Sequence, residues 1–361
     1  MMQSVVDVFG QNLIFALLLA LGLLGTLRPV REKLGFSIRV TNEVKGLAIL
    51  MIIFGHVGFF LFSDPGFLSP LSTVSGIGVD IFFLLSGYGL AASALRKNYS
   101  RRQFYQRRAG KIFIPLWLVL AVFLILDAVF LGRFYDWMVV IKSFLGFFPS
   151  ADIYQDLNSP LWYLTPLLFY YLLFPWGFRA RRGVLSAVVI ALVAYVFILL
   201  PWPINERVRD LYEEHFLAFP VGVALAAVSD GVGGLALKIK EKFKSRRAWI
   251  VVRYLLLVVL FFGFLYLVRG AVGGKWLAQI VSILSAIMAL LFFILLKLRV
   301  GLLELLGEYS YELYLLHWPL MYRYDFIFAA FPVGLGMALY IVYLLFFAYL
   351  LRKAVRGLSK A

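Results

Sequence analysis

The pattern of hydrophobic and polar positions divides the chain into long apolar stretches separated by short polar segments. About eleven of these stretches approach the roughly 20 residues that a helix needs to cross a bilayer. They begin near Asn12, Gly46, Val74, Ile112, Leu161, Val184, Phe216, Ile250, Trp276, Leu313 and Pro332. A further stretch, residues 137–148, is too short to span, so we expect it to lie in the interface or to re-enter. The pattern therefore predicts an all-α, polytopic transmembrane bundle.

Composition agrees with this fold and excludes several classes of function. Of the 361 residues, 63% are hydrophobic and only 15% are charged, which is more apolar surface than a soluble domain can bury. Cysteine is absent, so we expect neither disulfides nor a thiolate nucleophile. The net charge of +16 lies in short loops between the spans, so we expect membrane lipid rather than nucleic acid as the partner of these charges.

The signs of the loops alternate along the chain and predict its orientation. Residues 96–111 carry Lys and Arg without a single acid, whereas residues 205–214 are net acidic. Basic loops stay in the cytoplasm. We therefore expect a multi-pass protein of the cell membrane with its N-terminus outside and its C-terminus in the cytoplasm.

One histidine stands out because it lies inside an apolar span. His56 is the only strongly polar side chain in the span that follows Lys45. At about 100° per residue, the two side chains share one helix face and lie roughly 16 Å apart along the axis. An ionisable group at membrane depth indicates a functional site. We expect His56 to act as a general base, and Lys45 to be either an anion-binding group or a simple cytoplasmic anchor.

A carboxylate lies in the next span at a comparable depth. Asp80 should be about 9 Å below the outer edge if its helix begins near Val74. A carboxylate beside an imidazole fixes its tautomer and strengthens it as a base. We therefore expect Asp80 to orient His56; the alternative is a carboxylate in a water-filled vestibule.

Two further groups of residues are candidates for binding. Arg108 and Lys111 flank the entry to a span, where they could hold phosphates or only set the topology. Trp162 and Tyr163 lie in an outer aromatic-rich segment, where they could stack on a sugar ring or only belong to the aromatic belt.

The other two histidines have several possible roles, and the motifs that the sequence lacks exclude some classes of function. His317 lies inside a late span, where a structural hydrogen bond and a donor-site contact are both open. For His215, at the outer edge of a span, an interfacial role suffices. The sequence has no phosphate-binding Gly-Lys loop, no Gly-x-Ser-x-Gly elbow and no His or Cys cluster, so we expect no ATP-driven transport and no metal.

Taken together, the motifs resemble acyltransferase family 3, the integral membrane enzymes that O-acylate surface polysaccharides, lipopolysaccharide and peptidoglycan. Five elements carry the resemblance, in the order that the family has them. They are Lys45 and His56 with ten residues between them, the Gly-Val-Asp-Ile-Phe-Phe segment at residues 78–88, the basic element at residues 108–111, Leu-Trp-Tyr-Leu at residues 161–164, and Leu306 to His317.

The resemblance implies the reaction and its partners. An acyl-CoA, most simply acetyl-CoA, would bind from the cytoplasm as co-substrate, and the acceptor would be a hydroxyl of an extracytoplasmic glycan or lipid-linked saccharide. No permanently bound cofactor is implied. Lysine stands at positions 45 and 111, where the family more often has arginine, so bidentate phosphate contacts are weaker there. The chain resembles the stand-alone members, which acylate the acceptor directly or hand the acyl group to a partner protein.

We therefore expect residues 1–44 to form an N-terminal transmembrane helix with a basic cytoplasmic loop, and residues 45–361 to form the acyltransferase membrane domain. His56 is the expected base, Trp162 and Tyr163 would bind the acceptor, and a covalent acyl-histidine relay stays open. The donor site would comprise Lys45, Arg108, Lys111 and His317. The rival hypotheses are a proton-coupled transporter or flippase, for which we find no internal repeat, and a catalytically silent scaffold.

Overall fold

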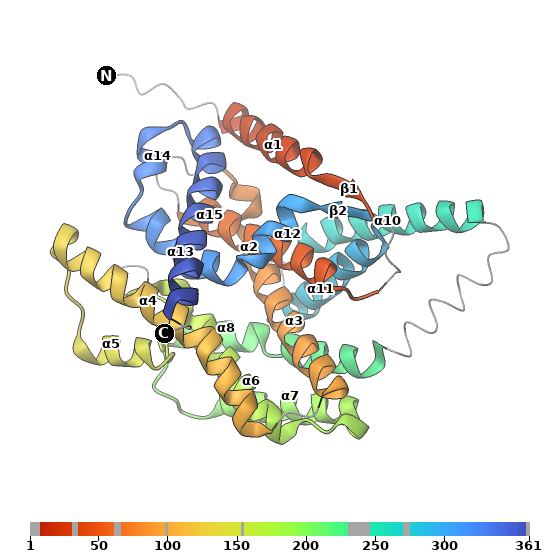
Figure 1. Ribbon diagram of the computed structural model, residues 1–361, viewed down its shortest axis with the longest axis horizontal. Helices are drawn as coiled ribbons and strands as arrows, with labels where there is room; N and C mark the ends of the chain where they lie inside the picture. The colour runs from red at the N-terminus through yellow and green to blue at the C-terminus, as the bar shows by residue number, and fades with distance from the viewer. Residues whose placement is uncertain are drawn as a thin grey trace.

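The computed structural model describes residues 8–30, 35–60, 66–97, 100–152, 155–229, 246–269 and 275–358. Its elements are almost all helical (Figure 1). The α-helices are α1 (Val8–Gly25), α2 (Ile38–Phe60), α3 (Ser75–Arg96), α4 (Arg101–Leu131), α5 (Trp137–Phe144), α6 (Leu164–Gly177), α7 (Gly183–Leu199), α8 (Glu206–His215), a helix over residues 218–229, α10 (Arg246–Arg269), α11 (Lys275–Leu295), α12 (Gly301–Glu308), α13 (Ser310–Tyr322), α14 (Phe326–Ala330) and α15 (Val333–Leu358). The 3-10 turns are η1 (Ser69–Val74), η2 (Ser159–Tyr163) and η3 (Ala180–Arg182), and the strands are β1 (Leu27–Pro29) and β2 (Leu298–Val300).

The polytopic helical bundle predicted from the apolar pattern is confirmed. Nine helical segments in the described part of the chain are long and apolar enough to cross a membrane. The other two predicted spans are the short helices α6 and α13, of 14 and 13 residues. Each is prolonged by a second helical piece, since η2 runs directly into α6 and only Tyr309 separates α12 from α13. The segment expected to be too short to span contains the eight-residue helix α5.

Two helices begin well before their apolar stretches. Helix α4 begins at Arg101 because Ser100 and Gln103 form a capping box, in which each side chain accepts a hydrogen bond from the backbone N–H of the other. Helix α2 similarly begins at Ile38, ahead of the apolar run. Hydrophobicity indicates which part of a helix lies in the membrane, whereas capping residues indicate where the helix begins. The basic residues that follow Arg101 are therefore helical and belong to α4.

Helix α2 lies at the centre of the bundle and packs against α3, α11, α12 and α13 (Figure 1). Its crossing with α12 depends on two glycines. A Cβ on Gly46 would lie 1.9 Å from the carbonyl oxygen of Leu303, and a Cβ on Gly307 would lie 1.8 Å from that of Asn42. Only glycine lets the two backbones approach so closely. The crossing therefore fixes the position of α12 and of the following α13 relative to α2.

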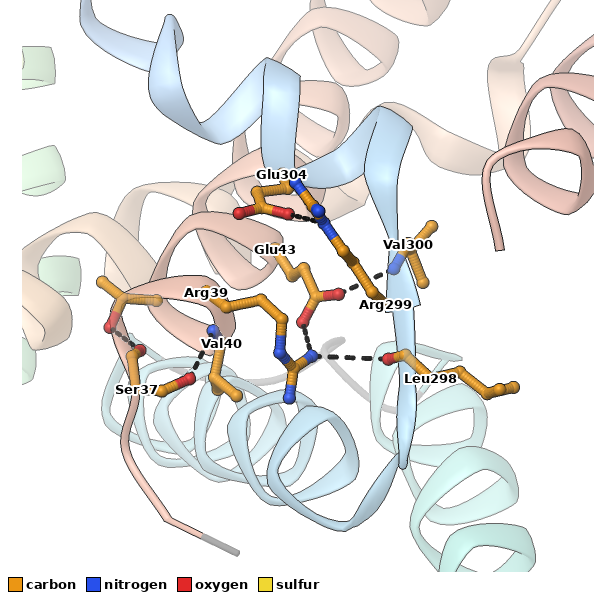
Figure 2. A network of polar contacts seen from close by, with 9 residues as sticks. Ser37, Arg39, Val40, Glu43, Leu298, Arg299, Val300 and Glu304 are labelled. Atoms are coloured by element: carbon orange, nitrogen blue, oxygen red, sulfur yellow. Dashed lines mark hydrogen bonds and ion pairs between the residues drawn. The ribbon is translucent and has the colours of Figure 1, made fainter. Parts of the chain in front are cut away.

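A buried carboxylate ties the beginning of α2 to β2 (Figure 2). Glu43 accepts a hydrogen bond from Arg39 Nη1 at 2.5 Å and another from the backbone N–H of Val300 at 2.7 Å. Both carboxylate oxygens are therefore paired, which a fully buried acid requires. The strand β2 pairs antiparallel with β1, a small departure from the all-α fold that we predicted.

Candidate active site

A cavity of about 480 Å³ lies between α2, α3, η2, α8, α11 and α13. Its wall includes two imidazoles, His56 from α2 and His215 from α8, together with Trp162 and Tyr163 from η2. His56 thus faces a cavity inside the protein and does not point into lipid. A cavity with convergent polar groups is the usual form of a small-molecule site.

His56 is paired with the other intramembrane histidine. Its Nδ1 lies 3.0 Å from Nε2 of His317, and the two rings stack with centroids 5.1 Å apart. The Nδ1 of His317 in turn lies 2.8 Å from the carbonyl oxygen of Tyr314. His317, which we predicted to be either a donor-site residue or a structural hydrogen-bonding residue, therefore lies beside His56. The contact between the two rings is of the second kind, a hydrogen bond.

The hydrogen-bond chain assigns the tautomers. A carbonyl oxygen only accepts, so His317 Nδ1 carries the proton that bonds to Tyr314. In a neutral ring His317 Nε2 then accepts, and His56 Nδ1 must donate to it. This leaves the lone pair of His56 on its Nε2, the ring nitrogen that can take a proton or attack a carbonyl carbon.

Our expectation that Asp80 orients His56 is wrong about the partner. The carboxylate of Asp80 is fully buried, and its Oδ1 lies 2.8 Å from Nδ1 of His215. Its other oxygen accepts a hydrogen bond from Ser282 Oγ. Depth along a helix does not determine the direction in which a side chain points. The sequence analysis also missed the place of His215 in the site. No local pattern around His215 indicates that its partner is Asp80, 135 residues away in the chain.

The predicted aromatic residues lie in the same cavity wall. The ring of Trp162 stacks on His215 with centroids 5.7 Å apart and an interplanar angle of 23°. The ring of Tyr163 packs edge-on against Tyr314 and tilted against Phe83. Both side chains line the cavity, and an acceptor-binding role for them stays a prediction.

A second pocket, of about 420 Å³, lies near the beginning of α4. Its lining contains five cations and no acid: Lys97, Arg101, Arg107, Arg108 and Lys111. Along α3, the lining of the first cavity ends at Val79 and that of the basic pocket begins at Leu90, which corresponds to about 16 Å of helix. The predicted donor residues Arg108 and Lys111 are thus in one pocket.

Two residues lie next to the basic pocket. Lys45 is close enough to Arg108 and Lys111 for their charges to act on it. Tyr171 lies with its ring 5.2 Å from the Arg108 guanidinium and is also a neighbour of Tyr163, which belongs to the wall of the first cavity.

No metal ligand set is visible in the described part of the chain, where no three His, Cys, Asp or Glu side chains are gathered around a common point. The polar side chains of the cavity wall include the two imidazoles, several hydroxyls, the Gln279 amide, the Arg207 guanidinium and the Glu214 carboxylate. Imidazoles and carboxylates are groups that can move protons.

Two comparisons with known proteins bear on this site. Residues 43–353 match the family model described as an acyltransferase domain. The protein named "Acyltransferase MdmB" from Streptomyces mycarofaciens is 35% identical over 130 residues, which cover 32% of this chain and 32% of that protein. The match thus spans about a third of the relative's length. No solved structure matches the chain.

Proposed function

Since the chain belongs to the acyltransferase family 3, whose domain model matches it over residues 43–353, we propose that this membrane acyltransferase moves an acetyl group from acetyl-CoA to a hydroxyl of a glycan. The acyl donor would occupy the basic pocket, and the acceptor would enter the cavity that holds His56. The observation that carries the proposal is the chain from Tyr314 through His317 to His56, which presents an unprotonated Nε2 in the wall of that cavity.

The donor site is argued from charge. Coenzyme A carries several phosphate charges, and the pocket at the beginning of α4 offers five cations with no acid among its lining residues. Arg108 supplies a planar guanidinium for a bidentate phosphate contact, whereas Lys111 acts as a point charge. Lys45 lies near Arg108 and Lys111 and on the same helix as His56, so it suits a negative group on the acyl-bearing arm of the donor.

The chemistry follows from the tautomer. His56 Nε2 takes the proton of the acceptor hydroxyl as that oxygen attacks the thioester carbonyl; the C–O bond forms and the C–S bond breaks. Alternatively, the same lone pair attacks the carbonyl and holds the acyl group before the acceptor arrives. In both schemes His317 Nε2 accepts the hydrogen bond from His56 Nδ1 and so orients the ring, the role that we had expected of Asp80.

The acceptor side is argued from the aromatic wall. Trp162 and Tyr163 offer ring faces and edges on which the apolar face of a sugar can lie. With the N-terminus outside, this cavity opens to the outer side of the cell membrane and the basic pocket faces the cytoplasm. The acceptor is then a surface glycan or lipid-linked saccharide, supplied directly or through a partner protein.

The proposal is tested by His56→Ala in vesicles supplied with radiolabelled acetyl-CoA. We expect ester-linked label to disappear while the purified variant keeps its elution profile and thermal midpoint. Ser72→Ala, which changes the same cavity wall without removing a base, serves as the control and should stay active. Normal acetylation by His56→Ala would refute the mechanism, and wild-type vesicles that never consume acetyl-CoA would favour the transporter hypothesis.

A further inference from the structure

The cavity wall contains a second imidazole that the proposed reaction has not used. His215 donates from Nδ1 to the carboxylate of Asp80, and that carboxylate is held on its other side by the Ser282 hydroxyl. The lone pair of the neutral ring therefore lies on Nε2. The side chain of His215 is 8% accessible, and it lines the same cavity as His56.

The partners of the two imidazoles differ in charge. His56 is backed by a neutral ring and a backbone carbonyl, whereas His215 is backed by a buried carboxylate. A carboxylate behind an imidazole stabilises the imidazolium that forms when the ring takes a proton. His215 is thus the better-supported proton acceptor of the pair.

From this contrast, and resting on the proposed function, we infer that His215 is the catalytic base that takes the proton of the acceptor hydroxyl, with Asp80 and Ser282 as positioning residues. His56 then serves as the group that carries the acyl chain between donor and acceptor. The division of labour explains why one cavity has two imidazoles whose Nδ1 atoms are both committed to other groups.

The steps balance. His56 Nε2 attacks the thioester carbonyl, the C–N bond forms, the C–S bond breaks, and the thiolate leaves as the His56 Nδ1 proton moves to His317 Nε2. The acceptor oxygen then attacks the acyl carbon while His215 Nε2 takes its proton, so that the C–O bond forms and the C–N bond breaks. The proton on His317 returns to His56, and His215 releases its proton to water. The net products are the ester, the thiolate of coenzyme A and one proton.

Gly76 offers a way to block this imidazole without breaking its pair with Asp80. A Cβ on Gly76 would lie 3.4 Å from Cε1 and 3.9 Å from Nε2 of His215, which are ordinary contact distances. Gly76→Ala should therefore fold and cover Nε2 with a methyl group. Gly89→Ala is the matched control, because it lies on the same helix and a Cβ there meets nothing within 4 Å.

The experiment separates the two half-reactions in vesicles supplied with radiolabelled acetyl-CoA. One readout is ester-linked label on the endogenous acceptor. The other is acetohydroxamate formed with added hydroxylamine, whose nitrogen attacks without first losing a proton. General bases contribute typically 10²–10⁴-fold, so His215→Gln should lower ester formation at least about 100-fold and leave hydroxamate formation within about twofold. His56→Ala, which removes both products, sets the background.

A second set of variants keeps the imidazole of His215 and changes only its surroundings. Asp80→Asn and Gly76→Ala should reproduce the split between the two products, whereas Gly89→Ala should match the wild type. Ester formation at the wild-type rate by His215→Gln overturns the inference, and so does an equal loss of both products in folded Gly76→Ala. Wild-type vesicles that form neither product overturn the proposed function instead, so the two failures are distinguishable.

Discussion

The close approach of α2 and α12 is tested by Gly46→Ala. The added Cβ would lie 1.9 Å from the carbonyl oxygen of Leu303, which falls short of an ordinary contact distance of 3.4 Å by 1.5 Å. Because the obstacle is backbone, no side-chain rotation relieves it, and the helices must separate. Overpacking of this kind costs typically about 1–3 kcal/mol, which outweighs the roughly 1 kcal/mol that alanine gains over glycine in a helix.

The same displacement acts on the site. Helix α2 carries His56, and α12 leads directly into α13 with His317. Their ring nitrogens lie 3.0 Å apart, and a separation of about 1.5 Å passed on in full would exceed the reach of a hydrogen bond. Misplacement by about 1 Å can cost a reaction on the order of 100-fold. We therefore expect Gly46→Ala to lose both stability and activity.

The assay measures the thermal unfolding midpoint in detergent and acetyl-CoA turnover on the same preparations. Gly46→Ala should unfold several degrees below the wild type and turn over at least about tenfold more slowly. Gly307→Ala, whose Cβ would lie 1.8 Å from the Asn42 carbonyl oxygen, should behave alike, and Gly89→Ala should not. If Gly46→Ala and Gly89→Ala are indistinguishable in both measurements, the crossing does not control the histidine pair.

Two further predictions concern the basic pocket and a buried ion pair. Arg108→Gln should raise the KM for acetyl-CoA at least about tenfold with little change in kcat, since a charge-assisted hydrogen bond contributes about 1.5–3 kcal/mol. Arg102→Gln, outside the pocket lining, is the control in initial-rate kinetics. Asp127→Asn should destabilise the protein by about 3–5 kcal/mol, because the fully buried Asp127 lies 2.7 Å from the Arg323 guanidinium. Tyr324→Phe, which removes one hydroxyl from the same carboxylate, should cost about 1 kcal/mol, and equal thermal midpoints for the two variants would contradict this ranking.

The helices could be predicted from the sequence because bilayer crossing imposes a length and an apolar composition on each span. The ends of α2 and α4 could not, since both helices begin in polar residues ahead of the apolar runs, and at α4 the Ser100 capping box fixes that beginning. The joint at Tyr309, which breaks one predicted span into α12 and α13, also has no hydropathy signal.

The sequence revealed the candidate residues of the site but not how they pair. An ionisable side chain in an apolar span stands out, so His56, Asp80 and His317 could be found as candidates. Their pairing depends on the rotation of each helix about its own axis, which is set by packing between segments 261 and 135 residues apart. Depth alone favoured Asp80 as the partner of His56, and the structure replaces it with His317.

The exchange of partners changes the chemistry that the site supports. One base backed by one carboxylate suits a single direct transfer, and that was the arrangement that depth suggested. The structure instead places two imidazoles in one cavity, one backed by the carboxylate of Asp80 and one by the neutral ring of His317. Two rings with unlike partners suit two unlike tasks, because a charged partner favours proton uptake and a neutral one leaves the ring to bond with carbon. In the two-step transfer that we propose, the identity of each partner, more than the presence of a histidine, therefore decides which step each imidazole performs.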